Sequence, residues 1–251
     1  MFYFVGAGPG DVGLITVKGR KLLEEADIVI YAGSLVSDKH LQFCKDKCEK
    51  YSSASMTLEE VMEVSIKGIK EGKKVVRLHT GDPTIYGAIR EQMDYLDNYN
   101  IEYEVIPGVS SFTASCSRIK REFTLPDVSQ TVIITRIEGR TPVPKDEDLE
   151  SLARHNASMA IFLSAQSIDK VVEKLKNGYG SDSVPVAVVY KATWEDEKIV
   201  LGTLKDIAEK IQKEGIKNFA QILVGRFIEG DYERSLLYNP DFTHGFREGN
   251  K

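Results

Sequence analysis

The sequence has no long apolar run, and this shortage excludes an integral membrane protein of the helical kind. No apolar stretch in the 251 residues approaches the roughly 20 residues that a membrane-spanning helix needs. The first residues also carry no basic segment ahead of their apolar run, so we do not expect a secretory signal. These features predict a cytoplasmic protein without a membrane partner.

Cysteine is scarce as well, with Cys44, Cys48 and Cys116 as the whole supply. Three thiols cannot all pair, which is typical of a reducing compartment. His40, Cys44 and Cys48 are spaced by four residues, so a helix there would place them on one face and could seed a metal site. A structural zinc site takes four ligands, and the sequence offers no second cluster, so we predict no metal.

Net positive charge is also lacking. The chain carries 33 Lys and Arg against 38 Asp and Glu, for a formal charge of −5. A general nucleic-acid partner is therefore not expected. The apolar content of 42% is ordinary for a globular protein, and 251 residues suffice for one large domain or two small ones.

Apolar strands and amphipathic helices alternate along the chain, which predicts an α/β fold. Most of the strands are apolar on both faces, as expected for strands that are covered on both sides. The predicted strands span residues 2–5, 27–31, 74–79, 102–106, 130–135, 158–163, 184–190, 198–201 and 220–224. The predicted helices span residues 16–25, 57–71, 85–97, 167–176 and 203–214. Thr57 and Glu60 have capping-box spacing, and Gly72 is a helix stop signal.

The stretch from Lys120 to Ser129 contains Pro126 and shows no period, so it is the predicted boundary between two lobes. We accordingly expect an N-terminal lobe over residues 1–122, a C-terminal lobe over 123–230 and a tail over 231–251.

A glycine-rich loop, Gly6 to Gly10, follows the first strand and raises the question of a nucleotide site. A dinucleotide fingerprint requires Gly-x-Gly-x-x-Gly, but here Asp11 occupies the third glycine position. Pro9 lacks an N–H for a phosphate, and Asp11 adds a negative charge. The loop is therefore poorly suited to anions, although its glycines permit close approach of the backbone to another surface.

Two further strands run into loops of the same kind. The loop after residue 79 reads TGDPTIYG, and the loop after residue 106 reads PGVSS. Because ligands of parallel sheets gather outside the carboxyl ends of the strands, three such loops in one lobe indicate a crevice built for a ligand.

These stretches together resemble the tetrapyrrole methyltransferases, which use S-adenosylmethionine in the synthesis of cobalamin and sirohaem. The likeness rests on VGAGPGDVGLIT (5–16), HTGDPTIYGA (79–88) and VIPGVSS (105–111). It is closer still to the precorrin-4 and cobalt-precorrin-4 C11-methyltransferases, through YAGSLV (31–36), LPDVSQTVIITRIEGRTPVP (125–144) and HNASMAIFLSA (155–165).

The resemblance implies two α/β lobes with a cofactor cleft between them, of the class III methyltransferase type, in a homodimer. It implies cofactor contacts from the first lobe at Pro9, Thr80, Gly81, Asp82, Ile85, Ser110 and Ser111. From the second lobe it implies contacts at Leu163 and Ala192. S-adenosylmethionine contains no phosphate, which agrees with an opening loop that is poor at holding anions.

The resemblance also implies a tetrapyrrole substrate that carries many carboxylates, and arginine pairs with carboxylates in a two-pronged way. Arg136 and Arg140 are the predicted substrate-binding residues because they lie in the family-like stretch after an apolar strand. Relatives that methylate uroporphyrinogen III carry an aspartate after the tyrosine of the second strand. Ala32 stands there in this chain, which disfavours that substrate.

The sequence shows no Ser/His/Asp or Cys/His arrangement, so no catalytic side chain is assigned. His79 is a candidate general base, but a histidine at this position is more often an ordinary strand residue. Several alternatives stay open at this point. They are another enzyme of the family (a different precorrin methyltransferase, a uroporphyrinogen III methyltransferase or diphthine synthase), a nicotinamide-dependent oxidoreductase, and a non-catalytic binding module.

Overall fold

A computed structural model describes residues 1–250 and divides them into two compact units. Unit 1 comprises Met1–Ala114 together with the short segment Lys191–Asp196. Unit 2 comprises Ser115–Tyr190 and the chain from Glu197 onward. The predicted lobe boundaries at residues 122 and 230 stay a prediction.

Unit 1 is built on a five-stranded sheet in which all paired neighbours are parallel. The strand order is β3-β2-β4-β1-β5, so β1 lies between β4 and β5. The strands are β1 (Phe2–Gly6), β2 (Ile28–Tyr31), β3 (Glu49–Ser52), β4 (Val75–His79) and β5 (Tyr103–Ile106).

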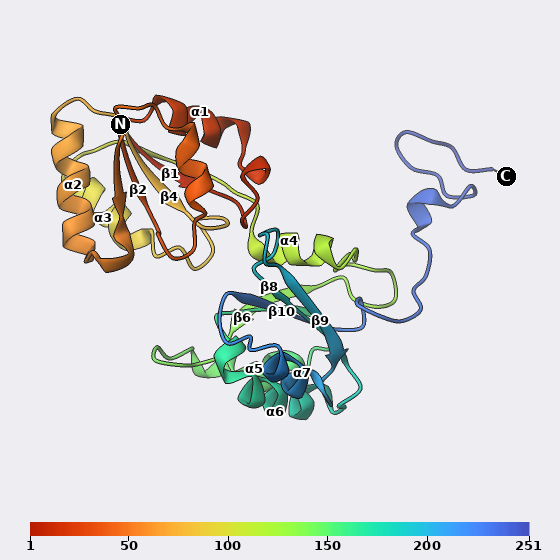
Figure 1. Ribbon diagram of the computed structural model, residues 1–251. Helices are drawn as coiled ribbons and strands as arrows, with labels where there is room; N and C mark the ends of the chain where they lie inside the picture. Colours follow the sequence, from red (N-terminus) through yellow and green to blue (C-terminus); the bar gives the residue numbers. More distant parts are fainter. Residues whose placement is uncertain (251) are drawn as a thin grey trace. The chain divides into compact units, whose positions relative to one another are not determined.

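Helices cover both faces of this sheet. Figure 1 shows α1 (Val17–Glu25) on one face, and α2 (Leu58–Lys70) and α3 (Arg90–Asn98) on the other. Each face has its own core: Leu22 and Leu23 of α1 pack with one set of strand side chains, and Val61 and Met62 of α2 pack with the other. This two-sided burial is the reason why the strands are apolar at successive positions.

Unit 2 contains a second five-stranded sheet, of mixed direction. Its order is β6-β7-β10-β8-β9; β6 and β7 are parallel, whereas β10 runs antiparallel to β7 and β8, and β8 antiparallel to β9. The strands are β6 (Val132–Arg136), β7 (Ser158–Phe162), β8 (Pro185–Tyr190), β9 (Lys198–Thr203) and β10 (Ala220–Val224).

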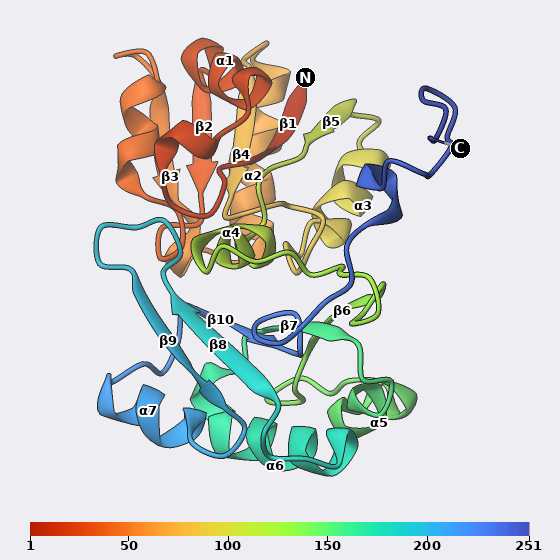
Figure 2. The same cartoon turned by 90° about the vertical axis from the view of Figure 1, so that its right-hand side faces the viewer.

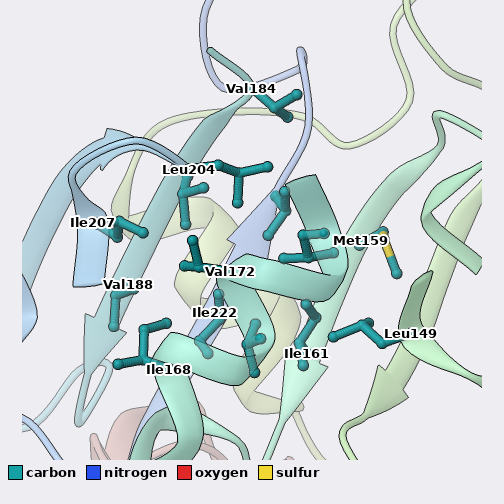
Figure 3. Packing of buried hydrophobic residues seen from close by; sticks show 14 of the residues in the cluster. Leu149, Met159, Ile161, Ile168, Val172, Val184, Val188, Leu204, Ile207 and Ile222 are labelled. Atoms are coloured by element: carbon teal, nitrogen blue, oxygen red, sulfur yellow. The ribbon is translucent and has the colours of Figure 1, made fainter. Parts of the chain in front are cut away.

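Three helices, α5 (Leu149–Ala153), α6 (Ile168–Tyr179) and α7 (Ile207–Lys213), pack against one face of the second sheet (Figure 2). They pack through an aliphatic core, in which Figure 3 shows Val172 and Ile168 of α6 beside Val188 and Ile222 of the sheet. Helix α6 is capped by Gly180, whose φ of +67° is the left-handed conformation that glycine adopts most readily.

The remaining helical segments are short. Helix α4 spans Ser111–Arg118. The 3₁₀ turns are Val12–Leu14, Asp38–Phe43, Ser53–Ser55, Lys145–Glu147, Ala165–Ser167 and Leu236–Tyr238.

All predicted strands are present, and the capping box of Thr57 and Glu60 is confirmed. Strand β3 was not predicted, because its residues Glu49–Ser52 are polar and lie at the sheet edge. Helix α3 begins at Arg90 and not at residue 85, since Tyr86 and Ala88 have positive φ angles that a helix excludes. Helix α7 likewise begins at Ile207 and not at 203. Helices α4 and α5 were not predicted.

Candidate functional site

Three loops of unit 1 follow three neighbouring strands. Loop A (Gly6–Gly10) begins at the last residue of β1, loop B (Thr80–Tyr86) follows β4, and loop C (Pro107–Ser111) follows β5. Because β4, β1 and β5 are adjacent and parallel, all three loops leave the same edge of the sheet. This is the edge where α/β sheets bind ligands.

Loops A and B are joined through their backbones. The Gly8 N–H donates to the Gly81 carbonyl at 3.2 Å, and the Gly81 N–H donates back to the Gly8 carbonyl at 2.8 Å. The Ala7 N–H donates to the carbonyl of His79 at 2.7 Å. The opening glycine loop is thus a partner of loop B, which explains its glycines without a phosphate.

Glycine is required at these contacts for reasons of space. A β-carbon on Gly6 would lie 2.6 Å from the Gly81 carbonyl oxygen, and one on Gly108 would lie 2.1 Å from the same oxygen. Gly8 and Gly81 also have positive φ angles of +82° and +58°. The close packing of three backbones therefore fixes the base of the candidate site.

Asp82 fastens loop B to loop C. Its Oδ1 accepts from the Thr84 N–H at 2.8 Å, and its Oδ2 accepts from the Gly108 N–H at 2.9 Å. A carboxylate oxygen has more than one lone pair, so an additional donor from a ligand is compatible with these bonds. Asp82 is nevertheless first a structural clamp, a role that its position in the sequence did not indicate.

The predicted cofactor residues fall into two groups. Loops A, B and C bring together those expected in the first lobe, namely Pro9, Thr80, Gly81, Asp82, Ile85, Ser110 and Ser111. Ala192, expected from the second lobe, belongs to unit 1 with them. Leu163 lies in unit 2 after β7, where it is 65% exposed with a φ of +52°. An exposed apolar side chain on a left-handed backbone is the kind of strain that gathers at functional positions.

The predicted substrate-binding arginines differ in their surroundings. The guanidinium of Arg136 donates to the carbonyls of Ile137, Thr141 and Pro142 at 2.7–3.2 Å, and so organises the loop after β6. Arg140, within that same loop, has an exposed side chain. Substrate binding by Arg136 and Arg140 stays a prediction. The hydrogen bonds of Arg136 also give it a structural role in its own loop.

His79 lies at the end of β4 and is 5% exposed. Burial, with a contribution from the charge of Arg77, lowers the pKa of His79 to about 3, so the imidazole is neutral near pH 7. Arg77 is itself buried, which lowers the pKa of its guanidinium to about 10, and it donates to the Ile30 carbonyl at 3.1 Å. A base with so low a pKa removes protons poorly, which weighs against His79 in that role.

The grouping of His40, Cys44 and Cys48 on one helix face is wrong. The 3₁₀ turn ends at Phe43, and both ring nitrogens of His40 lie near backbone carbonyls, Ser37 at 3.1 Å and Ala7 at 2.9 Å. Within residues 1–250, no three His, Cys, Asp or Glu side chains are grouped as metal ligands.

Among residues 1–250, no helix is both long and apolar enough to cross a bilayer.

Sequence reasoning missed Trp194, which contacts loop A, and Thr193, which contacts the next residue, Asp11. The Trp194 Nε1–H donates to the Pro9 carbonyl at 2.8 Å, and the Thr193 Oγ1 accepts from the Asp11 N–H at 2.9 Å. The signal available was that Trp194 is the only tryptophan of the chain and stands two residues after Ala192.

The chain matches known proteins over most of its length. The family described as Tetrapyrrole (Corrin/Porphyrin) Methylases matches residues 1–208. The chain belongs to this family. A cobalt-precorrin-4 C(11)-methyltransferase of Methanocaldococcus jannaschii is 58% identical over 98% of this chain and 96% of its own. The resemblance inferred from the sequence is thereby confirmed, and this tetrapyrrole methylase is placed beside the C11 enzymes.

Solved structures of tetrapyrrole methylases share the fold. A cobalt precorrin-4 methyltransferase, described as a cobalamin biosynthetic enzyme, matches with a TM-score of 0.89 and 48% identity, covering 91% of this chain and 96% of that one. A uroporphyrin-III C-methyl transferase of Thermus thermophilus, solved in complex with S-adenyl homocysteine, matches with a TM-score of 0.76 and 25% identity, covering 91% of this chain and 93% of that one.

Proposed function

We propose that this protein transfers a methyl group from S-adenosylmethionine to C-11 of cobalt-precorrin-4 or precorrin-4, a step of cobalamin biosynthesis. The observation that carries the proposal is the 58% identity, over 98% of the chain, to a cobalt-precorrin-4 C(11)-methyltransferase. The family match over residues 1–208 spans all three strand-end loops of unit 1.

The donor set of these loops fits S-adenosylmethionine. Thr80, Ser110 and Ser111 supply hydroxyls, the loop backbones supply N–H and carbonyl groups, and Asp82 supplies a carboxylate. Hydroxyl and backbone groups suit adenine, ribose and amino-acid ends, while a carboxylate and carbonyl oxygens suit the positive charge of an ammonium or sulfonium group. Lys and Arg are missing from loops A, B and C, which agrees with a ligand that has no phosphate.

The chemistry makes modest demands on side chains. The sulfonium supplies an activated methyl group, and an electron-rich carbon of a reduced tetrapyrrole is already nucleophilic. The protein therefore has to align carbon, methyl and sulfur and to keep water away. Loops joined by backbone hydrogen bonds and the Asp82 clamp suit that task, because a rigid site holds its ligands without reorganising.

Two further expectations belong to this proposal: the protein is a cytoplasmic homodimer, and Pro9, Ile85, Leu163 and Ala192 contact the methyl donor with the loop residues above. Light scattering on the purified protein tests the dimer. A mass near the 28.1 kDa of a single chain would contradict it.

The decisive experiment is incubation with cobalt-precorrin-4 and precorrin-4 in the presence of carbon-13 methyl-labelled S-adenosylmethionine. We expect NMR to place the label at C-11. A label at C-2 or C-7, with uroporphyrinogen III consumed in a parallel reaction, would assign the protein to the other branch of the family. Tight binding of NAD in calorimetry, without binding of S-adenosylhomocysteine, would exclude methyl transfer altogether.

A further inference from the structure

The segment Lys191–Asp196, which connects β8 and β9, packs onto loop A although some 180 residues separate them in sequence. Figure 2 shows it as the loop that closes the hairpin of β8 and β9. We propose that Thr193 and Trp194 of this segment are positioning residues, which hold Pro9, Gly10 and Asp11 in the conformation that binds the methyl donor. The inference rests on the proposed function.

Trp194 fits loop A through both its ring and its N–H. The indole Nε1–H donates to the Pro9 carbonyl at 2.8 Å. The ring occupies the space beside Gly10, where a β-carbon would lie 2.2 Å from the indole Cδ1. A side chain at residue 10 would therefore clash with the indole, so the packing of Trp194 requires glycine there.

Thr193 supplies the second attachment at a conformational cost. Its Oγ1 accepts from the Asp11 N–H at 2.9 Å. Its φ of +72° places a β-branched residue in the left-handed region, where such residues are true outliers. Lys191, two residues earlier, also has a positive φ of +46°. Strain of this kind persists when the surroundings enforce it, and it is frequent at ligand clamps.

The two attachments have a joint consequence for the predicted cofactor contacts. Ala192 is buried next to Thr193 in the sequence, and Pro9 carries the carbonyl that Trp194 holds. The segment therefore fixes Pro9 and Ala192 as parts of the same unit. A loss of either hydrogen bond should loosen loop A and weaken methyl-donor binding, even though neither side chain has to touch the ligand.

Four variants test the inference, with the dissociation constant of S-adenosylhomocysteine measured by calorimetry. Trp194→Phe keeps a ring beside Gly10 but loses the donor, and we expect a Kd about five- to tenfold higher, the size of a lost hydrogen bond. Thr193→Gly removes both strain and hydroxyl, and should raise the Kd similarly without lowering the melting temperature. Thr193→Ser restores the hydroxyl and should recover most of the affinity.

Glu195→Gln is the matched control, because Glu195 is in the same segment but forms an exposed ion pair with Lys39. Its Kd should stay within twofold of wild type. In turnover assays, Trp194→Phe and Thr193→Gly should raise the KM of the methyl donor with little change in kcat. If Thr193 had no part in positioning loop A for the ligand, the affinity of Thr193→Gly for S-adenosylhomocysteine would be unchanged.

The outcomes separate this inference from the proposed function. Wild-type protein that binds S-adenosylhomocysteine, with Trp194→Phe and Thr193→Gly binding equally well, overturns the inference and leaves methyl transfer standing. Wild-type protein that does not bind overturns the proposed function. Hydrogen exchange then still tests the contact itself: the Asp11 amide should exchange faster in Thr193→Gly than in wild type, and equal rates would show that the segment does not hold loop A.

Discussion

The carbonyl oxygen of Gly81 lies 2.1 Å from the position that a β-carbon on Gly108 would occupy. Loops B and C therefore touch backbone to backbone. In the third loop, a β-carbon built on Gly6 would lie 2.6 Å from the same carbonyl oxygen. This contact explains why residues 6 and 108 are glycines, since neither has room for a β-carbon. Gly81 itself has room for one, and its positive φ of +58° is what favours glycine there.

We predict that Gly108→Ala and Gly81→Ala have different costs. At residue 108 the new methyl group meets fixed backbone, so unfolding free energy should fall by about 3 kcal/mol. At residue 81 the nearest atom is 3.7 Å away and the main cost is the φ of +58°, about 1 kcal/mol. Urea unfolding of the two variants measures the difference. Equal losses would contradict the distinction between space and conformation.

Gly81→Val should be more harmful to ligand binding than to folding. A β-branched side chain tolerates the left-handed conformation poorly and would project at the junction of loops B and C. We expect the folded protein to persist, with S-adenosylhomocysteine bound at least tenfold more weakly. Unchanged affinity in calorimetry would show that the methyl donor binds away from this junction.

Asp82→Asn should loosen loop C. The amide can retain an oxygen for the Thr84 N–H, but its NH₂ group cannot accept from Gly108, whose N–H is 2.9 Å from Oδ2. Loss of a bond to a charged acceptor costs about 1.5–3 kcal/mol. Hydrogen exchange at residue 108 should accelerate, and the Kd for S-adenosylhomocysteine should rise. Wild-type exchange at this amide would argue against the clamp.

His79 should make the protein sensitive to mild acid. The pKa of His79 is lowered to about 3 by burial, against an ordinary value of 6.5, so between these values the unfolded chain binds a proton that the folded chain does not. The free energy of unfolding therefore decreases as pH falls below 6.5, by about 2 kcal/mol at pH 5. His79→Leu should remove this slope. The comparison is made by urea unfolding at pH 7.5 and pH 5, and an unchanged slope in the variant would assign the acid sensitivity to other groups.

Cys44 should be the most reactive thiol near neutral pH. A hydrogen bond from the Cys48 thiol lowers the pKa of Cys44 to about 7, while burial raises the pKa of Cys116 to about 11. Since the thiolate is the nucleophile, iodoacetamide at pH 8 should label Cys44 well before Cys116. Peptide mass spectrometry resolves the two sites. Loss of the hydrogen-bond partner in Cys48→Ala should shift the labelling midpoint of Cys44 upward, and a midpoint that does not move would refute the role of Cys48.

Alanine variants of Arg136 and Arg140 should distinguish the structural role of Arg136 in its loop from substrate binding by both residues. Both alanine variants are expected to raise the KM for the tetrapyrrole by about tenfold, because each loses a desolvated arginine–carboxylate pair that contributes to binding. Arg136→Ala should also lower stability, because three carbonyls of the loop lose their donor, whereas Arg140→Ala should not. S-adenosylhomocysteine affinity serves as the control and should stay unchanged. Wild-type kinetics in both variants would show that other side chains hold the carboxylates.

The sequence by itself determined the features that depend on neighbouring residues. The capping box at Thr57, the alternation of apolar strands with helices and the three glycine-rich loops are local patterns, and the structure contains all of them. The same motifs were specific enough to indicate the tetrapyrrole methylases. Local patterns succeed here because propensity, capping and turn chemistry act within a few residues.

Only the tertiary structure decided which distant residues meet. It joined Gly8 with Gly81 and Asp82 with Gly108, and it placed Trp194 against Pro9. It also gave the polar segment Glu49–Ser52 its place as an edge strand, and it turned the Arg136 guanidinium back onto its own loop. These contacts depend on how closely separate backbones approach, a quantity that packing sets and that no local pattern of residues encodes.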